Sequence, residues 1–167
     1  MPTPRQDSPL LHSRPIIIIA PEIPLHDLTK GMQLRFDEIP LRSIRLQGEG
    51  FDRYIFNTQP CVDELADSIG RVSLTSPPIV LSAEGGYVIV CGYARLQAVQ
   101  RMGWWTVPCQ ILDEGEKDER GLLLLSIEDN RFARKYNKME TEAIRDAFIN
   151  RLGYSAERVT VEVTPYL

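Results

Sequence analysis

The stretch Gly86-Tyr-Val-Ile-Val-Cys-Gly-Tyr-Ala-Arg-Leu-Gln-Ala-Val-Gln-Arg-Met-Gly103 decides the fold, because it combines a strand, a glycine turn and a helix. Residues 87–91 are apolar and largely β-branched, which predicts a short buried strand. Gly92 breaks this strand, and apolar residues then recur at helical spacing from residue 96 to residue 102. The stretch therefore predicts a strand that passes through a glycine directly into a helix.

The Gly92 turn also predicts an anion-binding site. Glycine lets a ligand approach the backbone closely, and the first N–H groups of the following helix have no intrahelical partner and favour an anion. Arg95 lies in the first turn of that helix and adds a charged donor. The same pattern also fits an ordinary strand, turn and helix with a solvated arginine, so both interpretations stay open at this point.

Apolar periodicity predicts the elements on either side of this stretch. The predicted strands cover residues 34–40, 79–82 and 104–112, and the predicted helices cover residues 60–72, 119–130 and 137–153. This order predicts an α+β sandwich, in which helices pack on a small mixed sheet of four to five strands. Trp104 and Trp105 are expected to close one end of the core. The residues expected in the core are Val62, Leu65, Ile69, Ile79, Val88, Val90, Leu96, Val99, Val107, Leu122, Leu125 and Phe148.

Composition limits the classes of function. The 167 residues have a net charge of −4, which argues against a general, sequence-independent DNA binder. The cysteines, at positions 61, 91 and 109, show no CxxC spacing, which predicts free thiols and a cytoplasmic protein. Both histidines lie within the first 31 residues, so a His-rich metal site is not expected. No apolar run is long enough to span a membrane.

Three regions are expected along the chain. Residues 1–31 are an N-terminal extension, in which the isoleucines from Ile16 to Ile19 can form an added strand between two prolines. Residues 32–153 form the main domain. Residues 154–167 end without a polar tail and are expected to begin a further, truncated region. Aromatic side chains between residues 47 and 58 are expected to fold that loop back onto the domain.

From residue 36 to about residue 152 the chain resembles the N-terminal domain of the ParB/sulfiredoxin superfamily. The segment Val90-Cys-Gly-Tyr-Ala-Arg-Leu-Gln-Ala98 resembles the family's Gly-Glu-Arg-Arg-x-x-Ala box. The segment Ser73-Leu-Thr-Ser-Pro-Pro-Ile-Val80 resembles its Gly-Leu-x-x-Pro-Pro-Ile-Val segment. The remaining matches, in the family's order, are Asp37-Glu-Ile-Pro-Leu-Arg-Ser-Ile44, Glu64-Leu-Ala-Asp-Ser-Ile69, Asp129-Asn130 and Asn137-Lys-Met-Glu140.

This resemblance implies a ParB-like module that binds CTP or ATP with magnesium, in a DNA-associated protein of chromosome or plasmid partition. Magnesium would bind through Asp129 or Asn130, in the segment that resembles the family's Glu-Asn. Either Arg131 or Arg134 would add charge beside the Gly92 turn. The nucleotide- or phosphate-binding residues implied in this way are Gly92, Tyr93, Arg95, Thr75, Ser76, Asn130, Arg131 and Arg134.

The departures from the family pattern restrict the activity. Tyr93 and Ala94 replace the Glu-Arg pair of the ParB box, which removes charged donors and weakens triphosphate binding. Tyr93 also occupies the position of the sulfiredoxin cysteine, so the sulfiredoxin reaction is not expected. Cys91 lies on the apolar strand and is expected to be buried and inert.

Two other functions stay open beside the ParB-like module. One is a small-molecule kinase or phosphotransferase of the same fold, for which Glu49, Asp52 and Glu64 are the candidate bases. The other is a degenerate domain that binds a protein partner and no nucleotide. DNA contacts would lie beyond Leu167 or on the basic connector at residues 131–138. Whether the chain forms a homodimer is left open.

Overall fold

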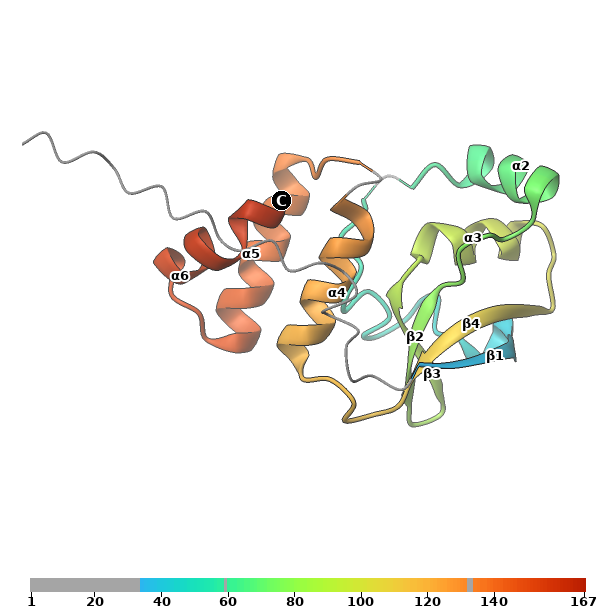
Figure 1. Ribbon diagram of the computed structural model, residues 1–167, viewed down its shortest axis with the longest axis horizontal. Helices are drawn as coiled ribbons and strands as arrows, with labels where there is room; N and C mark the ends of the chain where they lie inside the picture. Colours follow the sequence, from blue (N-terminus) through green and yellow to red (C-terminus); the bar gives the residue numbers. More distant parts are fainter. Residues whose placement is uncertain (1–33, 59, 132–133) are drawn as a thin grey trace, which may run out of the picture.

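The structure is a computed structural model that describes residues 34–58, 60–131 and 134–167 (Figure 1). The side chain of Arg131 and the segment from Ile16 to Ile19 lie outside the described residues. Helices α2 (Val62–Val72) and α3 (Tyr93–Arg101) lie together on one side of a sheet, and the later helices lie on the other side (Figure 1). The helices are α2 (Val62–Val72), α3 (Tyr93–Arg101), α4 (Glu119–Arg131), α5 (Lys138–Leu152) and α6 (Ala156–Glu162), with short 3-10 turns η1 (Leu41–Ser43) and η2 (Thr164–Tyr166).

The sheet has four strands in the order β1-β4-β2-β3 and is mixed. Strand β4 (Thr106–Leu112) pairs antiparallel with β1 (Arg35–Pro40) and parallel with β2 (Ile79–Ala83). Strand β2 turns directly into β3 (Gly86–Cys91) as an antiparallel hairpin. The predicted α+β class and the predicted order of elements are confirmed, and the sheet has the lower of the two expected strand numbers.

Apolar side chains pack into two clusters, one on each face of the sheet. Alternate residues of β4 explain this division, because side chains along a strand point to opposite faces. Val107 and Cys109 pack with α3 and the end of α2, whereas Leu112 packs with α4 and α5. The expected core is confirmed, with Val62 and Leu65 half-buried at its margin.

The end of the core near β4 differs from the prediction. Trp104 packs against the cluster beneath α3, but the Trp105 side chain is 89% exposed. The backbone explains this difference, because the Trp104 N–H donates to Val99 O and the Leu41 N–H donates to Trp105 O, both at 2.9–3.0 Å. These bonds fix the turn so that only the first indole faces inward.

The last fourteen residues add to the core cluster that packs with α4 and α5. Tyr154, Val159, Val163 and Tyr166 are buried against α4 and α5. Helix α5 begins with the predicted cap, because Asn137 and Glu140 exchange side-chain to backbone hydrogen bonds, and it ends at Gly153 in the left-handed conformation. No helix in the described parts of the chain is long and apolar enough to cross a membrane.

Helix α2 ends at a strained residue. Ser73 has φ 67° and ψ 177°, a region of backbone space that is essentially restricted to glycine. Its position matches the glycine of the Gly-Leu-x-x-Pro-Pro segment that the sequence resembles. The strain is located immediately before Thr75 and Ser76, which line the cavity described below.

Ser73→Gly is therefore expected to raise the free energy of unfolding. Relief of the strain is worth about 1–3 kcal/mol, and the extra freedom of glycine in the unfolded chain offsets about 0.5–1 kcal/mol of it. Urea denaturation monitored by circular dichroism measures the difference. Ser73→Ala is the matched control, because alanine keeps the Cβ and should bring no gain. Equal stabilities for Ser73→Gly and Ser73→Ala would show that the backbone at this position is not strained.

Candidate functional site

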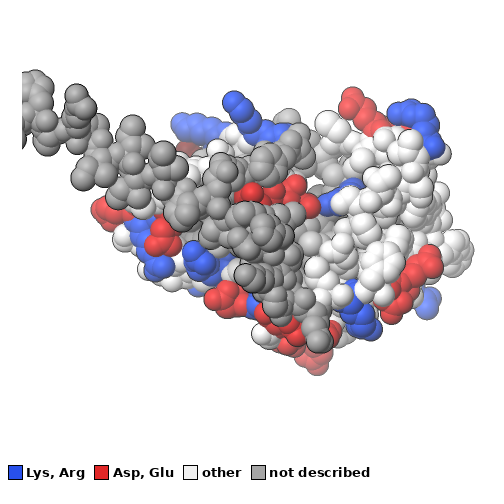
Figure 2. Space-filling view, viewed as in Figure 1, with Lys and Arg blue, Asp and Glu red and all other residues white. Residues whose placement is uncertain are grey.

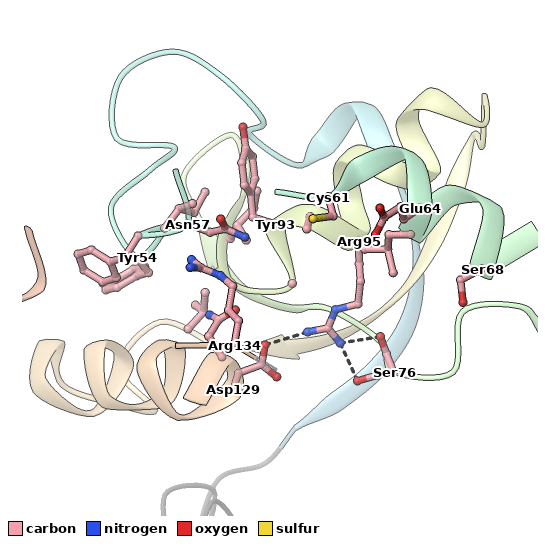
Figure 3. Close-up of a pocket in the computed structure, with 18 of the residues that line it drawn as sticks. Tyr54, Asn57, Cys61, Glu64, Ser68, Ser76, Tyr93, Arg95, Asp129 and Arg134 are labelled. Atoms are coloured by element: carbon pink, nitrogen blue, oxygen red, sulfur yellow. Dashed lines mark hydrogen bonds and ion pairs between the residues drawn. The ribbon is translucent and has the colours of Figure 1, made fainter. Parts of the chain in front are cut away.

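A cavity of about 690 Å³ opens where the Gly92 turn meets the end of α4 (Figure 3). One wall is the loop at residues 54–57, and the opposite wall is the first half of α2. The floor is formed by residues 75–76, by the start of α3 and by the last turn of α4. Segments that are far apart in the sequence therefore converge on one site.

Gly92 is required at this site by both conformation and space. Its φ is 89°, in the left-handed region that glycine adopts without cost. A Cβ at this position would lie 3.0 Å from Pro78 Cβ and 3.0 Å from Arg95 Nε. The turn therefore brings the backbone and the Arg95 side chain close together, while the first N–H groups of α3 have no intrahelical acceptors.

The Arg95 side chain is held in a fixed orientation beside the Gly92 turn. One guanidinium nitrogen donates to Ser76 O at 2.8 Å and to Ser76 Oγ at 2.6 Å, and the other donates to Asp129 Oδ2 at 2.8 Å (Figure 3). The Arg95 side chain is only 16% exposed. The interpretation as a solvated arginine is therefore wrong, because this side chain is pre-oriented by two segments of the cavity.

Arg134 enters the cavity from the connector before α5, and Asp129 lies between the two arginines in Figure 3. The Arg134 guanidinium makes two hydrogen bonds to the Glu140 carboxylate, at 2.7 and 2.9 Å. Glu140 is fully buried and also accepts from the backbone N–H and the hydroxyl of Thr58, at 2.8 and 3.0 Å. One buried carboxylate therefore joins Arg134, the loop and the start of α5.

The environment of Glu140 keeps it ionised. Burial alone raises the pKa of a carboxyl group, but the hydrogen bonds from Arg134, Thr58 and Asn137 outweigh burial and lower the pKa of Glu140 to about 2. The carboxylate is therefore charged at neutral pH and neutralises Arg134. Both arginines of the cavity thus face a carboxylate, which leaves the cavity with little net positive charge.

The cavity brings together nearly all of the residues implied by the resemblance. Its lining includes Gly92, Tyr93, Arg95, Thr75, Ser76, Asn130, Arg134 and also Asp129. Arg131 is the last residue of α4, and its side chain lies outside the described part of the chain. The role of the implied site residues in binding nucleotide stays a prediction.

Two implied site residues are already engaged by neighbours. The Asn130 side-chain amide donates to Ser126 O at 2.9 Å, back along α4. The hydroxyl of Tyr93 accepts from Gln97 Nε2 at 2.6 Å, and the Tyr93 ring lies 6.1 Å from that of Phe51. These contacts fix the Tyr93 ring as part of the cavity wall.

The candidate bases are not brought together. Glu64 is exposed on the first half of α2 and lines the cavity. Glu49 and Asp52 are exposed in the preceding loop and do not belong to the lining of the cavity. Of the three candidates, only Glu64 can reach a ligand that is bound there.

Several lining residues had no signal in the sequence. Tyr54 was expected to pack, and it is buried with its hydroxyl donating to Glu119 at 2.7 Å, but it also forms the cavity wall. Asn57, Cys61 and Ser68 line the cavity as well. Polar residues in a loop or on an exposed helical face are too common to be recognised without the fold.

The two buried cysteines, Cys91 and Cys109, give no sign of reactivity. Cys61, Cys91 and Cys109 are all free thiols in the structure, as predicted. Burial raises the pKa of the Cys91 thiol well above its usual value, and the neighbouring Asp129 acts in the same direction. Cys91 is therefore protonated at neutral pH, and its placement next to Gly92 does not provide a nucleophile.

The fold and the cavity define a small α+β domain with a pocket at a strand–glycine–helix turn. The model of the ParB N-terminal domain family matches residues 27–128. The chain belongs to the ParB N-terminal domain family.

Its relatives include a nucleoid occlusion protein and a probable plasmid-partitioning protein. The nucleoid occlusion protein of Halalkalibacterium halodurans is 27% identical over 99 residues, which cover 59% of this chain and 34% of that protein. The probable plasmid-partitioning protein ParB of Thermus thermophilus is 30% identical over 122 residues, which cover 72% of this chain and 38% of that protein. The chain thus spans about a third of the length of these relatives.

A solved structure has the same fold. A pNOB8-like ParB N-domain superposes with a TM-score of 0.55 and 16% identity, over 78% of this chain and 52% of that one. At this identity the superposition shows a shared fold. The resemblance to the ParB N-terminal domain found in the sequence is confirmed by the family match and the relatives.

Proposed function

We propose that the chain is the nucleotide-binding module of a DNA-associated partition or regulatory protein, and that it binds CTP or ATP with magnesium in the cavity at Gly92. The observation that carries this proposal is the convergence of the α3 N-terminus with Arg95 and Arg134. Backbone N–H groups and guanidinium groups are the donors that phosphate oxygens prefer. The cavity volume of about 690 Å³ is in the range of sites for molecules of nucleotide size.

The charges of the cavity favour a nucleotide that carries a metal ion. Arg95 faces Asp129 and Arg134 faces Glu140, so the four side chains together are close to neutral. A free triphosphate would bring several negative charges beside the Asp129 carboxylate. Magnesium prefers carboxylate oxygens together with phosphate oxygens and water, and the Asp129 carboxylate, with the Asn130 amide beside it, fits that donor set. Among the described residues no cluster of three or more His, Cys, Asp or Glu side chains can hold a metal without the nucleotide.

Calorimetry of the full chain with CTP, ATP and GTP, with and without magnesium, tests the proposal. Binding of CTP or ATP in the presence of magnesium is the expected result. If none of the three nucleotides binds, the nucleotide proposal fails, and the interpretation as a partner-binding domain replaces it.

Asp129→Asn is expected to change the magnesium dependence of this binding. The substitution keeps the shape and an acceptor for Arg95 but removes the negative charge. Affinity for CTP or ATP without magnesium should therefore rise severalfold, and the gain on adding magnesium should shrink. Asp146→Asn, an exposed residue of α5, is the matched control and should behave like the parent. A variant at Asp129 that keeps the full magnesium dependence of the parent would show that the metal binds elsewhere.

A kinase or phosphotransferase is the second candidate function. Among its candidate bases Glu64 is favoured, because it lines the cavity. A carboxylate in the wall of a nucleotide cavity can accept a proton from a hydroxyl substrate. Product analysis after incubation with ATP separates the two functions, because a switch module leaves the nucleotide intact or releases only inorganic phosphate, whereas a kinase transfers phosphate to an acceptor.

Contact with DNA is part of the proposal for the whole protein. The Lys and Arg side chains are interspersed with Asp and Glu over the face shown in Figure 2. Lys135 and Lys138 are exposed on the connector and the start of α5. A sequence-specific contact therefore fits better in a region beyond Leu167, or on this connector, than over the whole surface.

A further inference from the structure

A second groove, of about 990 Å³, lies at the turn that carries the exposed tryptophan. It is lined by η1 and the residues that follow it, up to residue 47, and by the turn at residues 103–106 between α3 and β4. None of its residues lines the Gly92 cavity. The groove is therefore separate from the proposed nucleotide site.

We propose that this groove binds a short acidic peptide segment of a partner protein. The first argument is its charge. Arg42 and Arg45 are the charged side chains among the described residues that line it, although the chain has more acidic than basic residues overall. A groove that bears only positive charge is complementary to carboxylates.

The second argument is the presentation of Trp105. The side chain is 89% exposed, while its carbonyl is fixed by the hydrogen bond from Leu41 N at 2.9 Å. A large indole is thus displayed on a fixed turn instead of packing on the core. Tryptophan and arginine are the residues most enriched among those that dominate binding energy at protein interfaces.

The third argument is the orientation of Arg45. Its guanidinium donates to the backbone carbonyl of Glu84 in the β2–β3 turn, which fixes the side chain at one end of the groove. Arg42 is exposed and makes no side-chain ion pair with the described residues. One oriented and one solvated arginine suit a peptide with two carboxylates, with an apolar side chain against Trp105 and Leu46.

The surroundings disfavour a nucleic acid in the same groove. Glu38 accepts a hydrogen bond from Thr106 at 2.7 Å beside the groove, and Glu84 lies next to Gly85 at its other end. A polyanion that extends past the two arginines would meet these carboxylates. A short peptide brings fewer negative charges toward these carboxylates than a polyanion does, and we therefore assign the groove to peptide.

Panning of a random peptide display library on the full chain tests this assignment, with each selected peptide measured by fluorescence anisotropy. The selected peptides should be rich in Asp and Glu, and high salt should weaken their binding. Trp105→Ala should lower their affinity at least about tenfold, and Arg42→Gln by a smaller factor. Arg71→Gln, an exposed arginine at the end of α2, is the control and should bind as the parent does. Because Trp105 is exposed, its variant is expected to keep the parent circular dichroism spectrum.

Three outcomes would overturn the proposal. One is the absence of any peptide that binds the parent better than Trp105→Ala. Another is the selection of peptides without acidic residues. The third is tighter binding of a single-stranded oligothymidylate that Trp105→Ala abolishes, which would assign the groove to nucleic acid. None of these outcomes depends on nucleotide binding at Gly92.

Discussion

Glu140→Ala is expected to lower the free energy of unfolding by about 3–5 kcal/mol, the largest effect of any substitution considered for this protein. The variant leaves the Arg134 guanidinium without its carboxylate, on a side chain that is only 31% exposed. It also removes the acceptor of the Thr58 and Asn137 backbone N–H groups. Urea denaturation at about pH 7 measures the loss. Glu142→Ala on the same helix, whose side chain is 62% exposed, is the control and should change stability by less than about 1 kcal/mol.

The same residue predicts a dependence of stability on pH. The pKa of Glu140 is about 2 in the folded protein against 4.5 as its ordinary value. A lowered pKa means that its contribution, about 3 kcal/mol, is fully present above pH 4.5 and is lost as the pH falls toward 2. Glu140→Gln should therefore flatten the decline of stability between about pH 5 and pH 2. A variant whose stability declines over this range as steeply as the parent's would contradict the role assigned to the buried pair.

Arg95→Ala is expected to weaken nucleotide binding by roughly ten- to hundredfold, which corresponds to about 1.5–3 kcal/mol for one charged hydrogen-bonding group. Because Ser76 and Asp129 hold the parent side chain at the turn, little ordering is needed when a phosphate arrives. Calorimetry with CTP and ATP measures the loss, and circular dichroism checks the fold. Arg101→Ala is the matched control, since Arg101 lies at the end of the same helix, paired with Asp63 on the surface.

Gly92→Val should reduce binding further than Arg95→Ala, because its side chain would meet Pro78 and Arg95 and would strain the turn. If the Arg95→Ala and Gly92→Val variants both fold and bind nucleotide as well as the parent, the phosphates bind elsewhere. If only Gly92→Val loses binding, the backbone of the turn carries the site and the arginine is structural.

Much of the fold follows from local patterns in the sequence. The strand at residues 87–91, the Gly92 turn and the cap of α5 were predictable because each depends on neighbours within a few residues. The approach of Asp129 to Arg95 was not predictable from spacing, because it depends on how α4 packs against β3. The pairing of Arg134 with Glu140 likewise combines a connector and a helix start, which the sequence shows only as a basic run and a cap.

Trp105 marks a different limit of sequence reasoning. Two adjacent tryptophans before a strand look equally apolar, and hydrophobicity alone assigns both to the core. The turn after Gly103 decides otherwise, because the Trp104 N–H donates to Val99 O while Trp105 O accepts from the Leu41 N–H, and with these bonds only Trp104 packs on the core. The fold therefore separates two residues that composition treats alike.

The shared carboxylate of Glu140 also has a kinetic consequence. The loop at Thr58 and the start of α5 both donate backbone hydrogen bonds to it, so opening either one leaves a buried, ionised carboxylate with fewer donors. We expect the amides of Thr58 and Glu140 to exchange with deuterium at similar rates, as members of one cooperative opening unit, although 82 positions separate them in the chain. The wall of the cavity would then be as long-lived as the helix that anchors it.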